Sequence, residues 1–175
     1  TGTVMLADGT EINSIPTAIS HSIAYASKDR DNESLVSNTS IRDNICLPSV
    51  DDLAIRGLVF KKKLDEFADK NAARISVKMT GTKQSVSELS GGNKQKIVLA
   101  RWLGKGSDIM ILDSPTRGID VKVKADIYSL MTELRNQGKS IIMISEEILE
   151  LIGMCDRILI MRNGALNGEF LRRPE

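Results

Sequence analysis

The pattern of hydrophobic and polar residues predicts small, mixed elements at the start of the chain. Residues 4–12 flank an Asp-Gly turn, which tolerates positive φ, and they predict a short β-hairpin. Pro16 favours the start of a short helix that reaches about Ser22, and the apolar run 23–26 predicts a buried strand. The polar residues 27–40 are expected to form a loop.

The centre of the chain has the spacing of an amphipathic helix. Between residues 49 and 78, apolar positions are interleaved with many Lys and Asp side chains. These apolar positions are Leu53, Leu58, Phe60, Leu64, Phe67 and Ala68. We expect a small helical subdomain with a charged, solvated face.

From Leu89 onward, helical stretches alternate with aliphatic runs, which is typical of a parallel sheet flanked by helices. Residues 109–112 and 141–144 are continuously apolar, and this predicts strands that are covered on both faces. The stretch 123–137 between them predicts a helix. An Asn-Gly turn at 163–164 separates two further strand-like runs and predicts a hairpin that forms an antiparallel edge.

Composition and charge narrow the class of protein. The 175 residues are 41% hydrophobic, which is enough for one or two compact units. Lys and Arg number 24 and Asp and Glu 23, so the net charge of +1 gives no general field for nucleic acid or an anionic membrane. The sequence has no run of about 18 apolar residues and no secretory leader, so we expect a cytosolic protein. The lone His21 and the separated Cys46 and Cys155 indicate neither histidine-based catalysis nor a metal or redox pair.

The run Ser90-Gly91-Gly92-Asn93 leads directly into a helical pattern and predicts an anion site. Two glycines let backbone N–H groups approach a phosphate, Ser90 adds a hydroxyl donor, and the helix directs its positive end at the same point. Each hydrogen bond to a charged group contributes about 1.5–3 kcal/mol, whereas the helix terminus contributes roughly 0.3–1 kcal/mol. The donors therefore matter more than the dipole. Taken alone, Ser-Gly-Gly before a helix is a common helix cap, and that interpretation is the better one.

Asp113 ends the apolar run 109–112, at the position where α/β sheets bind ligands. Its carboxylate is suited to holding Mg²⁺ through water. The alternative is that Asp113 caps the next helix. The order of the motifs, with the glycine-rich loop first and this carboxylate second, favours the ligand site.

The segments LSGGN, LARWL, ILDSPTRGIDV, IIMIS and RILIMRNG together resemble the second ATP-binding cassette of tandem monosaccharide importers of the ATP-binding cassette (ABC) family. The resemblance covers nearly all of the chain. Asn93 and the Arg-Gly-Ile-Asp run are similar to the ribose, galactose and xylose-type importers, and residues 23–30 resemble the segment that carries the family's Q-loop.

The resemblance implies an α/β fold, a P-loop NTPase-like ABC ATPase core with a parallel sheet and flanking helices, without the P-loop segment. Residues 1–48 would hold a β-hairpin and the Q-loop-like segment, and residues 49–88 the helical subdomain. Residues 89–175 would hold the signature helix, the Walker B α/β core and a small antiparallel hairpin.

The resemblance also implies roles for individual residues. Ser90, Gly91, Gly92 and Asn93 would bind, in trans, the ATP that a second cassette holds. Asp113 takes the Walker B position, where it would hold Mg²⁺ through water in a complete site. Lys28 takes the Q-loop position, and Gly118, Ile119 and Asp120 form the D-loop.

The implied cofactors are ATP and Mg²⁺. The implied partners are a second ATP-binding cassette, membrane permease subunits and, indirectly, a periplasmic or extracellular sugar-binding protein, with no nucleic acid. The chain would lie at the cytoplasmic face of the membrane as a peripheral subunit.

The sequence departs from the family pattern at four places. The only candidate for a P-loop, Gly138-Lys139-Ser140, lacks the first glycine and lies between a predicted helix and a predicted strand. Ser114 stands where the family has a glutamate, and a hydroxyl cannot act as that base near pH 7. Ser145 takes the switch-histidine position, and Lys28 departs from the Q-loop residue. We expect a chain that is inactive alone and begins downstream of the P-loop of a longer polypeptide, with a naturally degenerate cassette as the alternative.

Other functions stay open at this point. A regulatory or structural remnant is favoured by Ser114 and Lys28 and opposed by the intact Ser90-Gly91-Gly92 loop. A further alternative keeps the transport role but changes the cargo to a nucleoside or another sugar-like compound. DNA-repair and translation ABC ATPases share the signature and Walker B patterns but fit the neutral charge and the Arg-Gly-Ile-Asp run less well.

Overall fold

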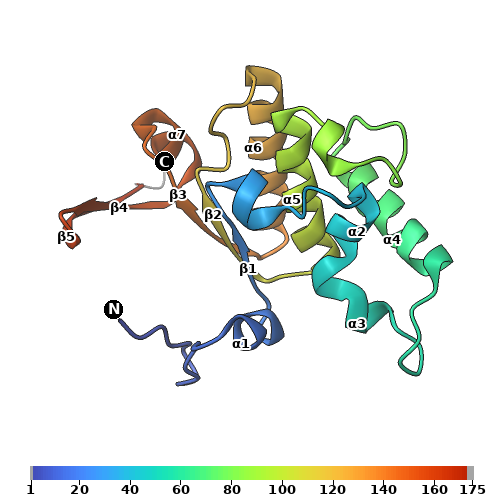
Figure 1. The fold of residues 1–175 in the computed structure, drawn as a ribbon. Helices are drawn as coiled ribbons and strands as arrows, with labels where there is room; N and C mark the ends of the chain where they lie inside the picture. Colours follow the sequence, from blue (N-terminus) through green and yellow to red (C-terminus); the bar gives the residue numbers. More distant parts are fainter. Residues whose placement is uncertain (1, 173–175) are drawn as a thin grey trace.

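The computed structural model describes residues 2–172 and contains a parallel sheet, a group of helices beside it and a separate hairpin (Figure 1). The strands are β1 (Ile23–Ala26), β2 (Ile109–Asp113), β3 (Ser140–Ile144), β4 (Arg157–Arg162) and β5 (Ala165–Leu171). The helices are α1 (Ile15–Ser20), α2 (Ile41–Cys46), α3 (Val50–Leu53), α4 (Lys61–Arg74), α5 (Gly91–Lys105), α6 (Val121–Asn136) and α7 (Ile148–Met154). Three short helical turns complete the order, η1 (Arg30–Ser34), η2 (Leu47–Ser49) and η3 (Val86–Glu88).

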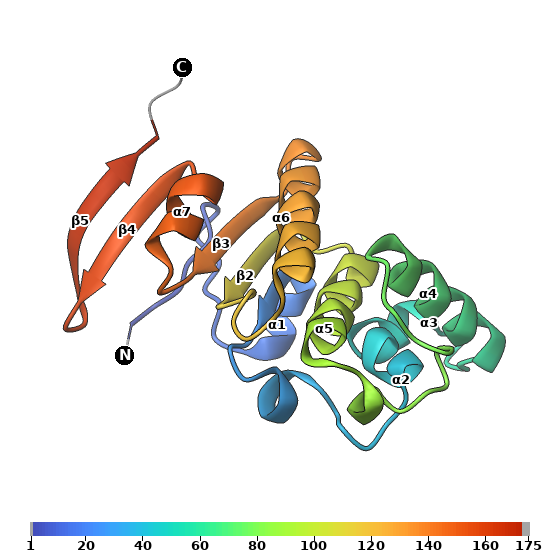
Figure 2. The ribbon, with the colours of Figure 1, turned by 90° about the horizontal axis from the view of Figure 1, so that it is seen from above.

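The parallel sheet confirms the α/β prediction. Its strand order is β1-β2-β3, with Ala24 paired to Met110 and Leu112 paired to Met143. One face of the sheet packs against α5 and α6 (Figure 2), where Met110 shares the core with Ile97 and Ile127. The ends of the three strands therefore have fixed positions relative to the two helices.

The second face of the sheet corrects the prediction that both faces are covered. Tyr25 on β1, and Ile142 and Ile144 on β3, are about half exposed, at 49%, 53% and 49%. Within residues 2–172 the burial of these strands alternates from one residue to the next. A continuous apolar run identifies a strand, but it does not reveal whether an element covers each face.

The helical group is built around α2, α4 and α5 and begins at Ile41, earlier than the predicted start near residue 49. Ser40 caps α2 by accepting a hydrogen bond from the Asp43 N–H at 3.1 Å. Leu58 and Phe60, expected among the helical apolar positions, lie before α4 and are 63% and 48% exposed. Their spacing fits a helix, but the chain turns there instead.

A buried arginine fixes the helical group to the segment after β1. The Arg101 guanidinium donates to the Asn44 carbonyl at 2.7 Å, to Asn44 Oδ1 at 3.0 Å and to the Ser34 carbonyl at 2.5 Å. Burial lowers the pKa of Arg101 to about 10, so it stays charged at neutral pH. Arg101 thereby holds η1 against α2 and α5.

The two predicted hairpins differ in outcome. Residues 4–12 turn at Gly9 and pair through the antiparallel bridge Met5 to Glu11 and two backbone hydrogen bonds of 2.9 and 2.8 Å, so the predicted hairpin is present but its strands are too short to count as regular elements. The hairpin of β4 and β5 is confirmed, with positive φ at Asn163 and Gly164. The prediction that this hairpin forms an edge of the larger sheet is wrong, because β4 and β5 make a two-stranded sheet of their own. Among the described residues, none of the helices is long and apolar enough to cross a bilayer.

Candidate functional site

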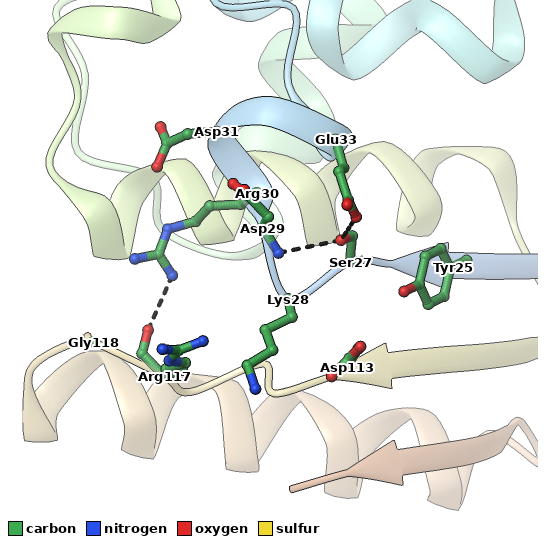
Figure 3. A pocket seen from close by; sticks show the side chains of 10 residues that line it. All are labelled: Tyr25, Ser27, Lys28, Asp29, Arg30, Asp31, Glu33, Asp113, Arg117 and Gly118. Carbon is green, nitrogen blue, oxygen red and sulfur yellow. Dashed lines mark hydrogen bonds between the residues drawn. The ribbon is translucent and has the colours of Figure 1, made fainter.

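An open pocket of about 570 Å³ lies where the loops after β1 and β2 meet (Figure 3). Lys28, Arg30 and Arg117 bring positive charge to it, and Asp113 lines it from the end of β2. Two predicted positions, Lys28 and Asp113, are thus brought together with Gly118 of the predicted D-loop. Parallel strands place the loops that follow them at one edge of the sheet, and this explains the convergence.

Asp113 is the last residue of β2, and Ser114 begins the loop that follows. Ser114 has φ of 49°, a left-handed conformation that non-glycine residues adopt rarely. Its Oγ donates to Asp113 Oδ1 at 3.1 Å, and its N–H donates to the Ile144 carbonyl at 2.8 Å. The hydroxyl at the expected glutamate position is therefore engaged by Asp113, the carboxylate at the predicted Walker B position.

Lys28 forms an ion pair across the sheet edge with the residue next to Ser145. Its Nζ lies 2.8 Å from Glu146 Oε1, and this hydrogen bond, together with the lysine charge, lowers the pKa of Glu146. Exposed pairs of this kind contribute little to stability. The pair does, however, join the predicted Q-loop position to the residue that follows the predicted switch position.

The predicted anion site is the start of α5. Ser90 is the N-cap residue, yet its side chain makes no capping hydrogen bond to the helix. Its Oγ instead accepts from Asn93 Nδ2 at 3.0 Å, and Asn93 Oδ1 accepts from the Lys78 N–H at 2.8 Å. The first N–H groups of a helix have no partner within the helix. At α5 they are left available, which an ordinary serine cap would not do.

Arg30 connects this helix start to the pocket. A Cβ added at Gly91 would lie 3.1 Å from Arg30 Nη2, and Arg30 Nη1 donates to the Arg117 carbonyl at 3.1 Å. Figure 3 shows the guanidinium reaching toward the loop that carries Gly118. Arg30 was not predicted as a site residue, because Arg117 and Gly91 are distant from it in the sequence. The one signal for Arg30 in the sequence was that a basic residue stands two positions after Lys28.

The last residue of the predicted D-loop, Asp120, is the N-cap of α6. Asp120 Oδ1 accepts from the Val123 N–H at 3.0 Å and so caps α6, and Val123 lies beside Gly92. A Cβ at Gly92 would lie 3.1 Å from Val123 Cγ2, which explains the need for glycine there. Because Asp120 caps α6, the alternative reading of Asp113 as that cap is wrong.

Ser145 belongs to a buried cluster that the sequence analysis missed. Its Oγ donates to Glu150 Oε2 at 2.6 Å, while the hydroxyls of Tyr128 and Thr116 donate to Glu150 Oε1, that of Tyr128 at 2.7 Å. Glu150 is only 7% exposed. Burial and the hydrogen bond to Glu150 raise the pKa of Tyr128 to about 12. Glu150 thus links the loop after β2 to the loop after β3.

The acidic side chains are arranged for a Mg²⁺ ion that keeps most of its water ligands, and not for a metal ion enclosed by protein ligands. Within residues 2–172, no three His, Cys, Asp or Glu side chains gather as a metal site. Mg²⁺ commonly keeps several waters and needs only one or two carboxylates besides phosphate oxygens. Asp113 fits that requirement.

Gly138-Lys139-Ser140 forms the turn between α6 and β3, as predicted, and Lys139 Nζ pairs with Asp108 at 2.6 Å.

Comparison with known proteins places these features in context. A family model described as ABC transporter matches residues 1–117. The ribose import ATP-binding protein RbsA of Bacillus licheniformis is 43% identical over 155 residues, which are 89% of this chain and 31% of that protein. The xylose import ATP-binding protein XylG of Thermoanaerobacter pseudethanolicus is 44% identical over 160 residues, 91% of this chain and 32% of that protein. The chain therefore spans about a third of the length of these curated relatives.

A solved structure confirms the fold. The dimeric post-hydrolysis state of the ATP-binding cassette MJ0796, bound to ADP and Pi, matches with a TM-score of 0.82 at 19% identity. The match covers 100% of this chain and 75% of that cassette. The predicted cassette core, with its parallel sheet, flanking helices and small antiparallel part, is thereby confirmed.

Proposed function

Because the chain belongs to the ABC transporter family, we propose that it donates the signature motif to ATP held by a second cassette in a monosaccharide importer. The relatives named for ribose and xylose import support this cargo class. The observation that carries the proposal is the start of α5, where Ser90 leaves the first N–H groups of the helix without a side-chain cap.

The residues at this helix start would act as a preorganised phosphate clamp. The N–H groups of Gly91 and Gly92 and the hydroxyl of Ser90 would donate to the γ-phosphate of the ATP. Asn93 is held by Ser90 and by the Lys78 N–H, so it would orient the Ser90 hydroxyl. Lys94 Nζ is engaged by Asp31 at 2.7 Å, and the Arg30 guanidinium beside Gly91 would add positive charge to the neutral donors. Fixed donors that need no reorganisation are effective at stabilising developing charge.

The pocket side of the chain would complete a nucleotide site of its own only in part. Asp113 would hold Mg²⁺ through water, and the metal would neutralise phosphate charge when bound. Ser114 and Ser145 would supply neither a base nor a histidine. Turnover would therefore depend on the glutamate and histidine of the partner cassette, and Asp120 in the D-loop would lie between the two sites.

The partners follow from this role. A second ATP-binding cassette would hold the nucleotide, and membrane permease subunits would convert closure around ATP into transport. A sugar-binding protein outside the membrane would deliver the cargo. The chain would act at the cytoplasmic face of the membrane as a peripheral subunit.

A second candidate function is a regulatory cassette that binds a partner without supporting turnover. It is favoured by the hydroxyls of Ser114 and Ser145, which are engaged by Asp113 and Glu150, and by the Lys28–Glu146 ion pair. The two candidates differ at the start of α5. A regulatory cassette has no need of donors that reach a phosphate.

Photolabelling separates the two candidates. ATP with a photoreactive group on its γ-phosphate is mixed with this chain, with and without an intact first cassette of a ribose importer. Signature donation predicts labelling near Ser90 only when the partner is present, and its loss in Gly91→Asp. A matched variant, Gly153→Asp in α7, has open space around the added side chain and should be labelled normally. Labelling that is absent with the partner, or unchanged by Gly91→Asp, contradicts the proposal.

A further inference from the structure

The turn between α3 and α4 forms an exposed tip on the helical group. Ile55 and Leu58 pair through two backbone hydrogen bonds of 2.8 and 3.0 Å, and Arg56 and Gly57 between them have φ of 51° and 78°. Positive φ at both central residues is the geometry of a tight hairpin turn, which fixes the direction of the chain. In Figure 1 the tip projects beyond α3 and α4, away from the parallel sheet.

Large apolar side chains of this tip face solvent. Leu58 is 63% exposed, Phe60 48%, Ile55 45% and Val59 41%. They follow one another within six residues, whereas Ala68 and Ala72 on the inner face of α4 are fully buried. Adjacent exposed apolar side chains beside polar ones mark an interaction surface.

Four basic residues lie in the same short stretch of the chain as these apolar side chains. Lys61, Lys62 and Lys63 fill the first turn of α4, which contains no acidic residue, and Arg56 occupies the turn. The positive end of a helix dipole disfavours cations in the first turn. The lysines therefore stand where they weaken their own helix, and this arrangement calls for a compensating anion outside the chain.

The cations of the tip are barely neutralised by the chain. Arg56, Lys61 and Lys63 make no ion pair among residues 2–172, and Lys62 reaches Glu66 only at 3.9 Å. The acidic side chains Asp52 and Asp65 nearby are engaged by other cations, Lys105 at 2.5 Å and Arg42 at 3.1 Å. Residues 55–63 themselves contain four basic residues and no acidic residue, although the net charge of the whole chain is only +1.

We propose that this basic-apolar tip, residues 55–63, docks on the surface of an anionic lipid bilayer. The lysines and Arg56 contact lipid phosphates, while Leu58 and Phe60 enter the interface between head groups and acyl chains. Clusters of four or more Lys and Arg next to apolar side chains are attracted to anionic leaflets within about a Debye length. An anionic bilayer is favoured over a zwitterionic one, because only the anionic bilayer has a negative surface potential that attracts the four cations.

This inference names the surface for the membrane association proposed above and rests on that part of the proposed function alone. The test contains no nucleotide and no partner cassette. If the membrane-binding test fails, the proposed signature role is unaffected. If the photolabelling test fails, the proposed membrane contact of the tip is unaffected.

The test is co-sedimentation of the 175-residue chain with phosphatidylcholine vesicles, with and without phosphatidylglycerol. We expect binding to the anionic vesicles only, weakened by salt. Each basic residue contributes about fivefold to the partition coefficient. Lys61→Gln/Lys62→Gln/Lys63→Gln should therefore lower it about a hundredfold. The matched control Lys78→Gln/Lys83→Gln/Lys122→Gln removes the same charge from exposed sites elsewhere and should bind nearly as the unmodified chain does.

A second variant tests the apolar part. Leu58→Asn/Phe60→Asn should weaken binding to anionic vesicles without lowering the thermal unfolding temperature of the chain, since both side chains are exposed and Asn is a favourable residue at the N-cap of α4. Equal binding to neutral and anionic vesicles, or normal binding by the triple lysine variant, overturns the proposal. Binding only to bacterial membrane vesicles that retain integral proteins, and not to protein-free anionic vesicles, also overturns it and assigns the tip to a membrane protein.

Discussion

Cys46 is enclosed by α2 and α4, and its reactivity follows from that position. Its side chain is 1% exposed, and burial raises the pKa of its thiol from 9.0 to about 11. The thiolate is the reactive form, so alkylation of Cys46 by iodoacetamide at neutral pH should be negligible until urea unfolds the chain. Cys155 is half-buried and should react first. Rapid labelling of Cys46 in the native chain, located by mass spectrometry, would show that α2 and α4 separate readily.

The same thiol makes stability depend on alkaline pH. The folded pKa is raised above the unfolded value, so the contribution of Cys46 is fully present below pH 9.0 and is lost as pH rises toward about 11. The urea midpoint should fall over that window. It should fall less in Cys46→Ala, although that variant starts from a lower stability because it leaves a small cavity. An identical pH dependence in both proteins contradicts the assignment.

Glu150 is the buried carboxylate that holds Thr116, Tyr128 and Ser145 together. Hydrogen bonds to a charged group contribute about 1.5–3 kcal/mol each and are not additive. Glu150→Ala should therefore lower the free energy of unfolding by roughly 2–4 kcal/mol, and Glu150→Gln by less because the amide keeps an acceptor. Urea unfolding followed by circular dichroism measures both. Equal effects of the two variants would mean that the cavity, and not the hydrogen bonding, determines the loss.

At the scale of elements, the contact between α4 and α5 depends on a glycine in a helix. A Cβ added at Gly104 would lie 2.6 Å from Phe67 Cζ and 2.9 Å from the buried Asn71 Nδ2. Gly104→Ala should lower the free energy of unfolding by about 1–3 kcal/mol through overpacking. Gly153→Ala in α7 meets no atom within 4 Å and should instead stabilise by roughly 0.5–1 kcal/mol. If both variants are stabilised, the two helices are not packed as closely as described.

Elements with a clear local pattern could be predicted from the sequence. The Asn-Gly turn at 163–164, the apolar runs of β2 and β3, and the helix after Ser90 each follow from a few neighbouring residues. The start of α2 and the open face of the sheet could not be predicted in this way, because burial depends on which distant elements pack against a segment. Leu58 and Phe60 have the spacing of a helix in the sequence, but they lie in the turn before α4.

The candidate site could be predicted only as far as the family motifs reach. Asp113, Lys28 and Ser90 carried recognisable patterns, and the structure places Lys28 and Asp113 at one pocket. Arg30 and Glu150 make contacts with residues more than thirty positions away. Such contacts arise from the fold, and a single sequence gives no signal of them.

At the scale of the whole molecule, the chain should bind Mg-ATP weakly and show no turnover alone. Most phosphate contacts in such ATPases come from a P-loop and its lysine, and the 175 residues contain no such motif. Ser114→Glu should not restore activity, because a base cannot act on an unpositioned phosphate. Calorimetry and a phosphate-release assay test this. Micromolar affinity, or turnover in Ser114→Glu above the unmodified chain, would reveal a nucleotide grip elsewhere in these residues.

The most direct test of signature donation is the ATPase rate of an importer assembled with this chain and reconstituted in vesicles. Gly91→Asp should slow turnover and uptake between tenfold and a hundredfold, since losing one charged hydrogen bond costs about 1.5–3 kcal/mol. Ser114→Ala should change little because its hydroxyl is not a base, and Gly153→Asp should change nothing because its position is open. Normal turnover in Gly91→Asp would contradict the account and favour the regulatory cassette.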